Sequence, residues 1–304
     1  MAKVYPNGLA DVNHFHAAGG LGFMIGELLD AGLLHDDTTP GMGSGPAAYA
    51  QEPKIKDGTL VWEDGAKVTQ NDKILRPGGE AFQPTGGLKQ MYGNLGHGMM
   101  KVSAVAPERH IIEAPARVFH DQASVKQAFK NGEFTSDTVI VVRFQGPKSN
   151  GMPELHGLTP TLAVLQDRGL KVALVTDGRM SGASGKVPSA IHISPEAAAG
   201  GPLAKLRDGD VVRLDANAGT LEAKVDAATW AERELVVANL DHYHVGLGRE
   251  LFSGFRHLAM RGEEGAGSLG CGTPGALLFS LANGDGTRVS SHHQCRWVFQ
   301  RCIV

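Results

Sequence analysis

The spacing of apolar residues near the start of the chain predicts one amphipathic helix. Apolar side chains recur at the i, i+4, i+7, i+8 spacing that places them on one helix face, at Leu21, Ile25, Leu28 and Leu29. We expect this helix to end near Gly32, because a glycine commonly follows the last helical turn. Residues 38–58 are rich in proline and glycine and follow neither period. Residues 1–76 are therefore expected to be loop-rich, and mostly helical where they are regular.

From about residue 80 the pattern changes to short β-branched runs separated by turn residues. The run at 139–144 is almost entirely apolar, as in a strand that is buried on both faces. Two helices are expected in the same region, at Leu155–Asp167 and along an apolar stripe from 247 to 259 that begins after Gly246. The predicted strands are Val102–Val105, Val118–Phe119, Val139–Phe144, Lys171–Thr176, Val211–Leu214 and Leu221–Val225.

These elements predict the end of an α/β domain followed by a curled, barrel-like β domain with a few helices. The predicted boundary lies near Pro77-Gly78-Gly79, where two glycines follow a proline. The fold class is thus α/β and β. Residues 272–304 fit neither period and have no Glu or Lys, so we expect a tail that adds no element to the fold and is disordered.

Composition narrows the class of protein. Hydrophobic residues make up 42% and charged residues 20% of the 304 residues, as in a soluble globular protein. The net charge of −3 gives no general attraction to nucleic acid or anionic lipid, so neither partner is expected. The first residues lack the apolar core of a signal peptide, and no run of 18 apolar residues exists. With only three cysteines, a cytoplasmic protein with reduced thiols is expected.

Two glycine-containing loops follow predicted buried strands and carry the candidate chemistry. In the first, residues 145–156, Glu154 is expected in the first helical turn, where a carboxylate could bind a hard cation such as Mg²⁺. The alternative is that Glu154 only complements the helix dipole. A strand that turns into a helix is a frequent ligand site in α/β proteins, but the spacing alone favours the helix-dipole interpretation.

In the second loop, residues 176–186, three glycines would allow close approach of the backbone to a ligand. Ser181 is expected at the crest of this loop, and Arg179 and Lys186 could hold an anionic substrate. The loop is not a P-loop, because Met180 stands where the first glycine of that motif belongs. The alternative is an ordinary glycine turn with a capping serine.

The histidines and cysteines give weaker indications of a metal site. Paired histidines occur at 14/16, 242/244 and 292/293, but no carboxylate or cysteine lies at ligand spacing beside them. Three cysteines without a C-x-x-C pair favour unrelated thiols over an iron–sulfur site. A cluster held by Cys271, Cys295 and Cys302 stays open as the least favoured alternative.

Both loops resemble the dihydroxy-acid/6-phosphogluconate dehydratase family. The similarity rests on Gln-Gly-Pro-Lys-x-Asn-Gly-Met-Pro-Glu-Leu-His at 145–156 and on Val-Thr-Asp-Gly-Arg-x-Ser-Gly-Ala-Ser-Gly-Lys-Val-Pro-Ser-Ala-Ile-His at 175–192. It extends from about residue 3 to 271. The phosphogluconate branch is indicated by further motifs, namely Tyr-Pro-Asn-Gly at 5–8, Ala-Asp-Val-Asn-His-Phe at 10–15, Ala-Ala-Gly-Gly at 17–20 and Gly-Asn-Leu-Gly at 93–96.

The resemblance implies a cytoplasmic hydro-lyase of the Entner–Doudoroff pathway that removes water from 6-phosphogluconate, a small sugar-acid phosphate. It also implies a [4Fe–4S] cluster, a divalent cation such as Mg²⁺, and a homodimer. In the family pattern, Ser181 matches the proposed base and Glu154 matches a metal ligand. Arg179 and Lys186 are our own candidates for contacts to the substrate carboxylate or phosphate.

The chain departs from the family in one respect that affects activity. The cluster cysteines of the family lie in an N-terminal α/β region that has no counterpart here. We therefore interpret 1–76 as a remnant of that domain, 80–271 as the barrel-like domain and 272–304 as a tail outside the family, and we expect the isolated chain to be inactive. Alternatives are a dihydroxy-acid or sugar-acid dehydratase, or a non-catalytic subunit that pairs with a separate cluster-binding chain.

Overall fold

The computed structural model describes residues 1–43, 45–180, 185–264 and 267–268. Within them the chain divides into two compact units, one up to Gly86 and the other from Gly87 onward. None of the described helices is long and apolar enough to cross a membrane.

The first unit is built from short helices and a β-hairpin around a small core of Ala18, Phe23 and Leu75. The predicted helix is present as α2 and ends as expected, with Gly32 left-handed at a φ of +67°. The hairpin was not predicted, because its first strand is almost fully exposed and shows no alternation of apolar and polar residues. The elements are α1 (Val12–Ala17), α2 (Gly20–Asp30), 3₁₀ helices Pro46–Ala50 and Gly78–Glu80, β1 (Gln51–Lys56) and β2 (Thr59–Asp64).

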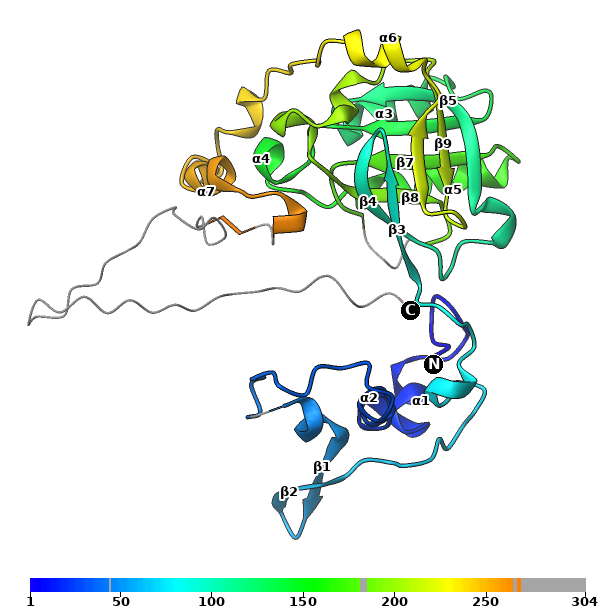
Figure 1. Ribbon diagram of the computed structural model, residues 1–304, viewed down its shortest axis with the longest axis vertical. Helices are drawn as coiled ribbons and strands as arrows, with labels where there is room; N and C mark the ends of the chain where they lie inside the picture. Colours follow the sequence, from blue (N-terminus) through cyan, green and yellow to red (C-terminus); the bar gives the residue numbers. More distant parts are fainter. Residues whose placement is uncertain (44, 181–184, 265–266, 269–304) are drawn as a thin grey trace, which may run out of the picture. The chain divides into compact units, whose positions relative to one another are not determined.

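The second unit is a closed barrel of eight strands in the order β10-β3-β4-β8-β7-β6-β5-β9 (Figure 1). The predicted barrel-like β domain is therefore present. Strands β5 to β8 run parallel to one another in succession, and the remaining pairs are antiparallel except β10 with β3. The strands are β3 (Leu88–Gly93), β4 (Gly96–Lys101), β5 (Ile111–Phe119), β6 (Thr138–Val142), β7 (Val172–Thr176), β8 (Ser189–Ser194), β9 (Val211–Asp215) and β10 (Thr220–Ala223).

Strand β6 shows why the central runs of this barrel are apolar throughout. Val139 and Val141 belong to the cluster that fills the barrel, whereas Ile140 and Val142 pack outward in a second cluster. Side chains of α3 (Gln122–Lys130) and α5 (Thr159–Asp167) belong to that second cluster, and both helices lie against the barrel in Figure 1. Because both faces of the strand are buried, no polar position interrupts it.

Several predicted elements differ from the structure. Val102–Val105 is wrong as a strand: β4 ends at Lys101, and a turn follows. Strands β3, β4 and β8 were not predicted, since glycine and polar residues dilute their patterns. The helix expected from 247 to 259 is only α7 (Ser253–Leu258), because Leu247 and Gly248 adopt left-handed backbone conformations that break the helix before it.

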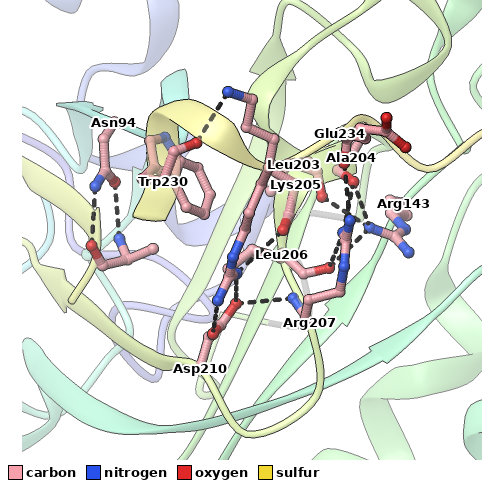
Figure 2. Close-up of polar contacts among 12 residues, drawn as sticks. Asn94, Arg143, Leu203, Ala204, Lys205, Leu206, Arg207, Asp210, Trp230 and Glu234 are labelled. Atoms are coloured by element: carbon pink, nitrogen blue, oxygen red, sulfur yellow. Dashed lines mark hydrogen bonds and ion pairs between the residues drawn. The ribbon is translucent and has the colours of Figure 1, made fainter. Parts of the chain in front are cut away.

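A buried arginine at the end of β6 binds the segment 203–206 in the barrel unit (Figure 2). Arg143, directly after β6, is only 5% exposed, and its Nη1 donates to the carbonyls of Leu203, Ala204 and Leu206 at 3.0, 3.2 and 3.1 Å. Burial lowers its pKa to about 10, so the side chain is still charged at neutral pH. A second arginine, Arg207, binds two of the same carbonyls and also that of Glu234.

Arg143→Met is expected to lower the free energy of unfolding by about 2 to 4 kcal/mol, because three buried carbonyls lose a charged donor. Urea unfolding followed by circular dichroism measures this. The matched control is Arg168→Met, at the exposed end of α5, which should cost less than about 1 kcal/mol. Equal losses in the two variants would contradict the assigned role of Arg143.

Candidate active site

The two loops singled out in the sequence lie side by side in the structure. They follow β6 and β7, which are parallel neighbours with Val142 opposite Thr176. Further along, Glu154 and Arg179 form an isolated parallel bridge, and the N–H of Leu155 donates to the Arg179 carbonyl at 3.0 Å. Strand pairing therefore brings together two segments about 25 positions apart.

Glu154 and Arg179 form an ion pair at this bridge. Arg179 Nη1 lies 2.7 Å from Glu154 Oε2, and Arg179 Nε donates to the Met152 carbonyl at 2.9 Å. The other carboxylate oxygen, Glu154 Oε1, is buried and has no hydrogen-bond partner among the described residues. The expected place of Glu154 in a first helical turn is wrong, since the 3₁₀ helix begins at His156 and α5 at Thr159. Its carboxylate therefore lies before the first helical turn and is paired with Arg179.

An acidic residue that the sequence analysis did not select fixes the geometry of both loops. Asp177, directly after β7, is 1% exposed and accepts N–H bonds from Phe144, Gln145 and Ala197 at 3.1, 2.9 and 2.9 Å. Burial raises its pKa to about 6, while the three donors act in the opposite direction. The signal that could have found it is an acid that directly follows a buried strand and precedes a glycine.

A second buried carboxylate, that of Glu196, binds the backbone of the first loop, residues 145–156. Glu196 accepts the N–H groups of Lys148 and Ser149 at 2.7 and 3.1 Å, and also the Ser149 hydroxyl. Gly146 is required here, because a Cβ at this position would lie 2.4 Å from Glu196 Oε2. Gly178 is required for the same kind of reason, since its Cβ would lie 2.7 Å from the Cβ of Gln145. The motif glycines thus allow the loops to pack.

Three residues in or beside the two loops have strained backbone conformations. Phe144, Met152 and His192 all have left-handed φ values, at +63°, +57° and +56°. Such conformations cost free energy for residues with a side chain and persist where surrounding contacts impose them, which is common at functional sites. His192 is close enough to Arg179 that burial and the guanidinium charge both lower its pKa, and its N–H donates to the Gly178 carbonyl.

Where the structure describes the remaining predicted residues, it does not bring them together with Glu154 and Arg179. Ser181 lies outside the described residues, as do Cys271, Cys295 and Cys302. Lys186 is exposed, and its carbonyl accepts a bond from Gln166 of α5. Within the described part of the chain, no hydrogen bond or ion pair joins the Lys186 side chain to Arg179 or Glu154.

The described residues can supply one ligand for a divalent cation. The buried, unpartnered Oε1 of Glu154 is a hard anionic oxygen of the kind that Mg²⁺ prefers. No group of three or more His, Cys, Asp or Glu side chains that could hold a metal comes together in the described residues. These residues alone therefore do not form a complete cation site of such side chains.

A family profile described as dihydroxy-acid/6-phosphogluconate dehydratase, C-terminal, matches residues 73–266. The match covers well over half of the chain and both loops of the candidate site. The chain belongs to this dehydratase family. The resemblance of the two loops is thereby confirmed.

Curated members of the dehydratase family are similar over most of the chain. A phosphogluconate dehydratase of Pseudomonas aeruginosa is 60% identical over 266 residues, and one of Escherichia coli K12 is 52% identical over 266 residues, each match covering 88% of this chain. A dihydroxy-acid dehydratase of Acetivibrio thermocellus is 36% identical over 230 residues, 74% of the chain. The match covers 44% of the first two relatives and 38% of the third, so the chain spans about half the length of the curated relatives it matches.

Proposed function

We propose that this chain is the C-terminal part of a 6-phosphogluconate dehydratase. The observation that carries the proposal is the difference in similarity: 52 to 60% identity to two phosphogluconate dehydratases against 36% to a dihydroxy-acid dehydratase. The substrate would be a small sugar-acid phosphate, and the enzyme would work in the cytoplasm as a homodimer. A dihydroxy-acid or sugar-acid dehydratase is the second candidate.

The reaction would remove a proton from C2 of the substrate and hydroxide from C3. The C2 proton is weakly acidic because it lies beside the carboxylate, and the enol that forms becomes the 2-keto product by tautomerisation. Ser181 is the proposed base, on the family resemblance. An unperturbed serine hydroxyl is too weak for this task, so its pKa must be lowered by nearby positive charge.

A divalent cation and the [4Fe–4S] cluster would supply a Lewis acid for the departing C3 hydroxyl. On the side of this chain, Glu154 would offer Oε1 to the cation while its Oε2 stays paired with Arg179. Arg179, held by the Met152 carbonyl, would then present its remaining N–H groups to the substrate carboxylate. Asp177 and Glu196 would hold both loops in place during the reaction.

The isolated chain is expected to give no product from 6-phosphogluconate after anaerobic reconstitution, and to hold near-zero iron and sulfide. Reconstitution together with the part of the P. aeruginosa relative that lies outside the match should restore dehydration. Product is measured as 2-dehydro-3-deoxy-6-phosphogluconate, with gluconate and a dihydroxy acid as alternative substrates.

Each other outcome of this experiment points to a named alternative. Several irons per chain with turnover by the isolated chain would mean that Cys271, Cys295 and Cys302 are ligands, and Cys295→Ser would then abolish iron binding. Co-purification of the two parts without turnover on any substrate would favour a non-catalytic subunit. Turnover of the dihydroxy acid alone would favour the second candidate.

A further inference from the structure

The segment 241–259 packs against the first loop of the site through arginines. Arg249 Nη2 donates to both the carbonyl and the side-chain oxygen of Asn150, at 3.0 and 2.9 Å, and its Nε donates to the Tyr243 carbonyl. Asn150 in turn donates to Gln145 Oε1 at 3.1 Å. A Cβ added to Gly151 would lie 3.5 Å from Cδ of Arg256, so the stem of this second arginine covers the turn.

These two arginines are close to each other and lack an acidic partner. Arg256 is only 7% exposed, yet it donates to the Arg249 carbonyl at 2.7 Å and to His244 Nδ1 at 3.3 Å rather than to a carboxylate. In the described residues, neither arginine forms an ion pair, and Nη1 of each takes part in no hydrogen bond. Glu250, whose charge acts on Arg256, is exposed and accepts the Gly246 N–H.

Mutual repulsion of the two guanidinium groups is the expected consequence of this arrangement. The pKa of Arg256 is lowered by burial and by the charge of Arg249, and Glu250 opposes this only in part. A buried cation is costly unless it is paired or hydrogen-bonded. Two neighbouring cations with unused N–H donors form a site to which a dianion would bind favourably.

The pair lies within reach of the Glu154–Arg179 end of the site. Arg249 binds the carbonyl of Asn150 and Arg179 binds that of Met152, two residues further along the same loop. Two residues of extended chain span at most about 7 Å, and each hydrogen bond adds about 3 Å. The bonded nitrogens of Arg249 and Arg179 are therefore separated by no more than roughly 13 Å. An extended six-carbon acid phosphate can bridge such a separation.

We propose that Arg249 and Arg256 bind the phosphate group of the substrate, while its carboxylate end faces Arg179 and Glu154. The proposal rests on the proposed function, because it takes the substrate to be a phosphorylated sugar acid. Guanidinium groups suit this role, since their planar N–H donors match phosphate oxygens in pairs. Both side chains are already held by carbonyl acceptors, so little rotamer entropy is lost on binding. The same two residues would disfavour an unphosphorylated substrate, which leaves them unpaired.

Binding of 6-phosphogluconate, gluconate and inorganic phosphate to the intact chain, measured by isothermal titration at constant ionic strength, tests this site. We expect saturable binding of 6-phosphogluconate and of phosphate, with gluconate at least tenfold weaker. Arg249→Gln should weaken 6-phosphogluconate at least tenfold and leave gluconate unchanged, and Arg249→Lys should fall between. The control Arg168→Gln should change neither affinity.

The possible results separate this proposal from the proposed function. Equal affinity of the wild-type chain for gluconate and 6-phosphogluconate, or unchanged selectivity in Arg249→Gln, would overturn the phosphate site. These readouts do not depend on Arg256 variants, which could fail to fold. Phosphate binding without dehydration in the reconstituted enzyme would leave the site standing and contradict the proposed function. Dehydration by the reconstituted enzyme, with unchanged phosphate selectivity in Arg249→Gln, would support the proposed function and contradict the phosphate site.

Discussion

Asp177→Ala is expected to lower the free energy of unfolding of the barrel unit by at least about 3 kcal/mol. The substitution leaves three buried N–H donors, of Phe144, Gln145 and Ala197, without an acceptor. Each buried donor without a partner costs about 1 to 3 kcal/mol, and Asp177 is only 1% exposed. The loss is a large fraction of the stability of an ordinary domain.

Urea unfolding of wild type and variant, followed by circular dichroism, measures this loss. The matched control is Asp167→Ala at the exposed end of α5, for which a change within about 0.5 kcal/mol is expected. Hydrogen exchange gives a second readout: the amides of Phe144, Gln145 and Ala197 should lose protection first. A variant as stable as wild type, with those amides still protected, would show that Asp177 does not hold the loops.

Ser181→Ala in the reconstituted enzyme is expected to lower kcat for 6-phosphogluconate by about 10² to 10⁴-fold, the usual contribution of a positioned general base. Glu154→Gln should lower activity by a similar factor, because the amide oxygen carries no charge for the cation. It should also weaken cation binding, measured as the Mg²⁺ or Mn²⁺ concentration that gives half-maximal activity. Ser181→Ala should leave that concentration unchanged.

Two surface substitutions serve as controls for these variants. Glu133→Gln breaks an exposed ion pair in the barrel unit, between Glu133 Oε2 and Arg117 Nη2 at 2.9 Å. Like the Glu154–Arg179 pair, it joins a glutamate to an arginine. Ser136→Ala removes an exposed hydroxyl from the loop before β6. Both should retain activity within about twofold. Near-normal turnover by Ser181→Ala would exclude this serine as the base, and an unchanged cation requirement in Glu154→Gln would exclude that carboxylate as a ligand.

The success and failure of the strand predictions follow from burial. Strands β6 and β7 were found because both of their faces are covered, which buries every position and makes all but one threonine in each strand apolar. Strand β4 has the sequence Gly-His-Gly-Met-Met-Lys and was missed, since Gly98 leaves room for Ile191 and Ile193 of the neighbouring strand. A glycine that is required by the side chains of an adjacent strand gives no periodic signal along its own strand.

The sequence by itself determined the family, the barrel-like class of the second unit and the two loops that carry Glu154 and Arg179, because these depend on residues close together in the chain. Only the tertiary structure decided what those residues contact. The pairing of Glu154 with Arg179 spans 25 positions, the hold of Asp177 on Phe144 spans 33, and that of Arg249 on Asn150 spans 99. Local patterns report burial and turn formation, whereas the partner of a carboxylate or guanidinium depends on which distant segments the fold brings together.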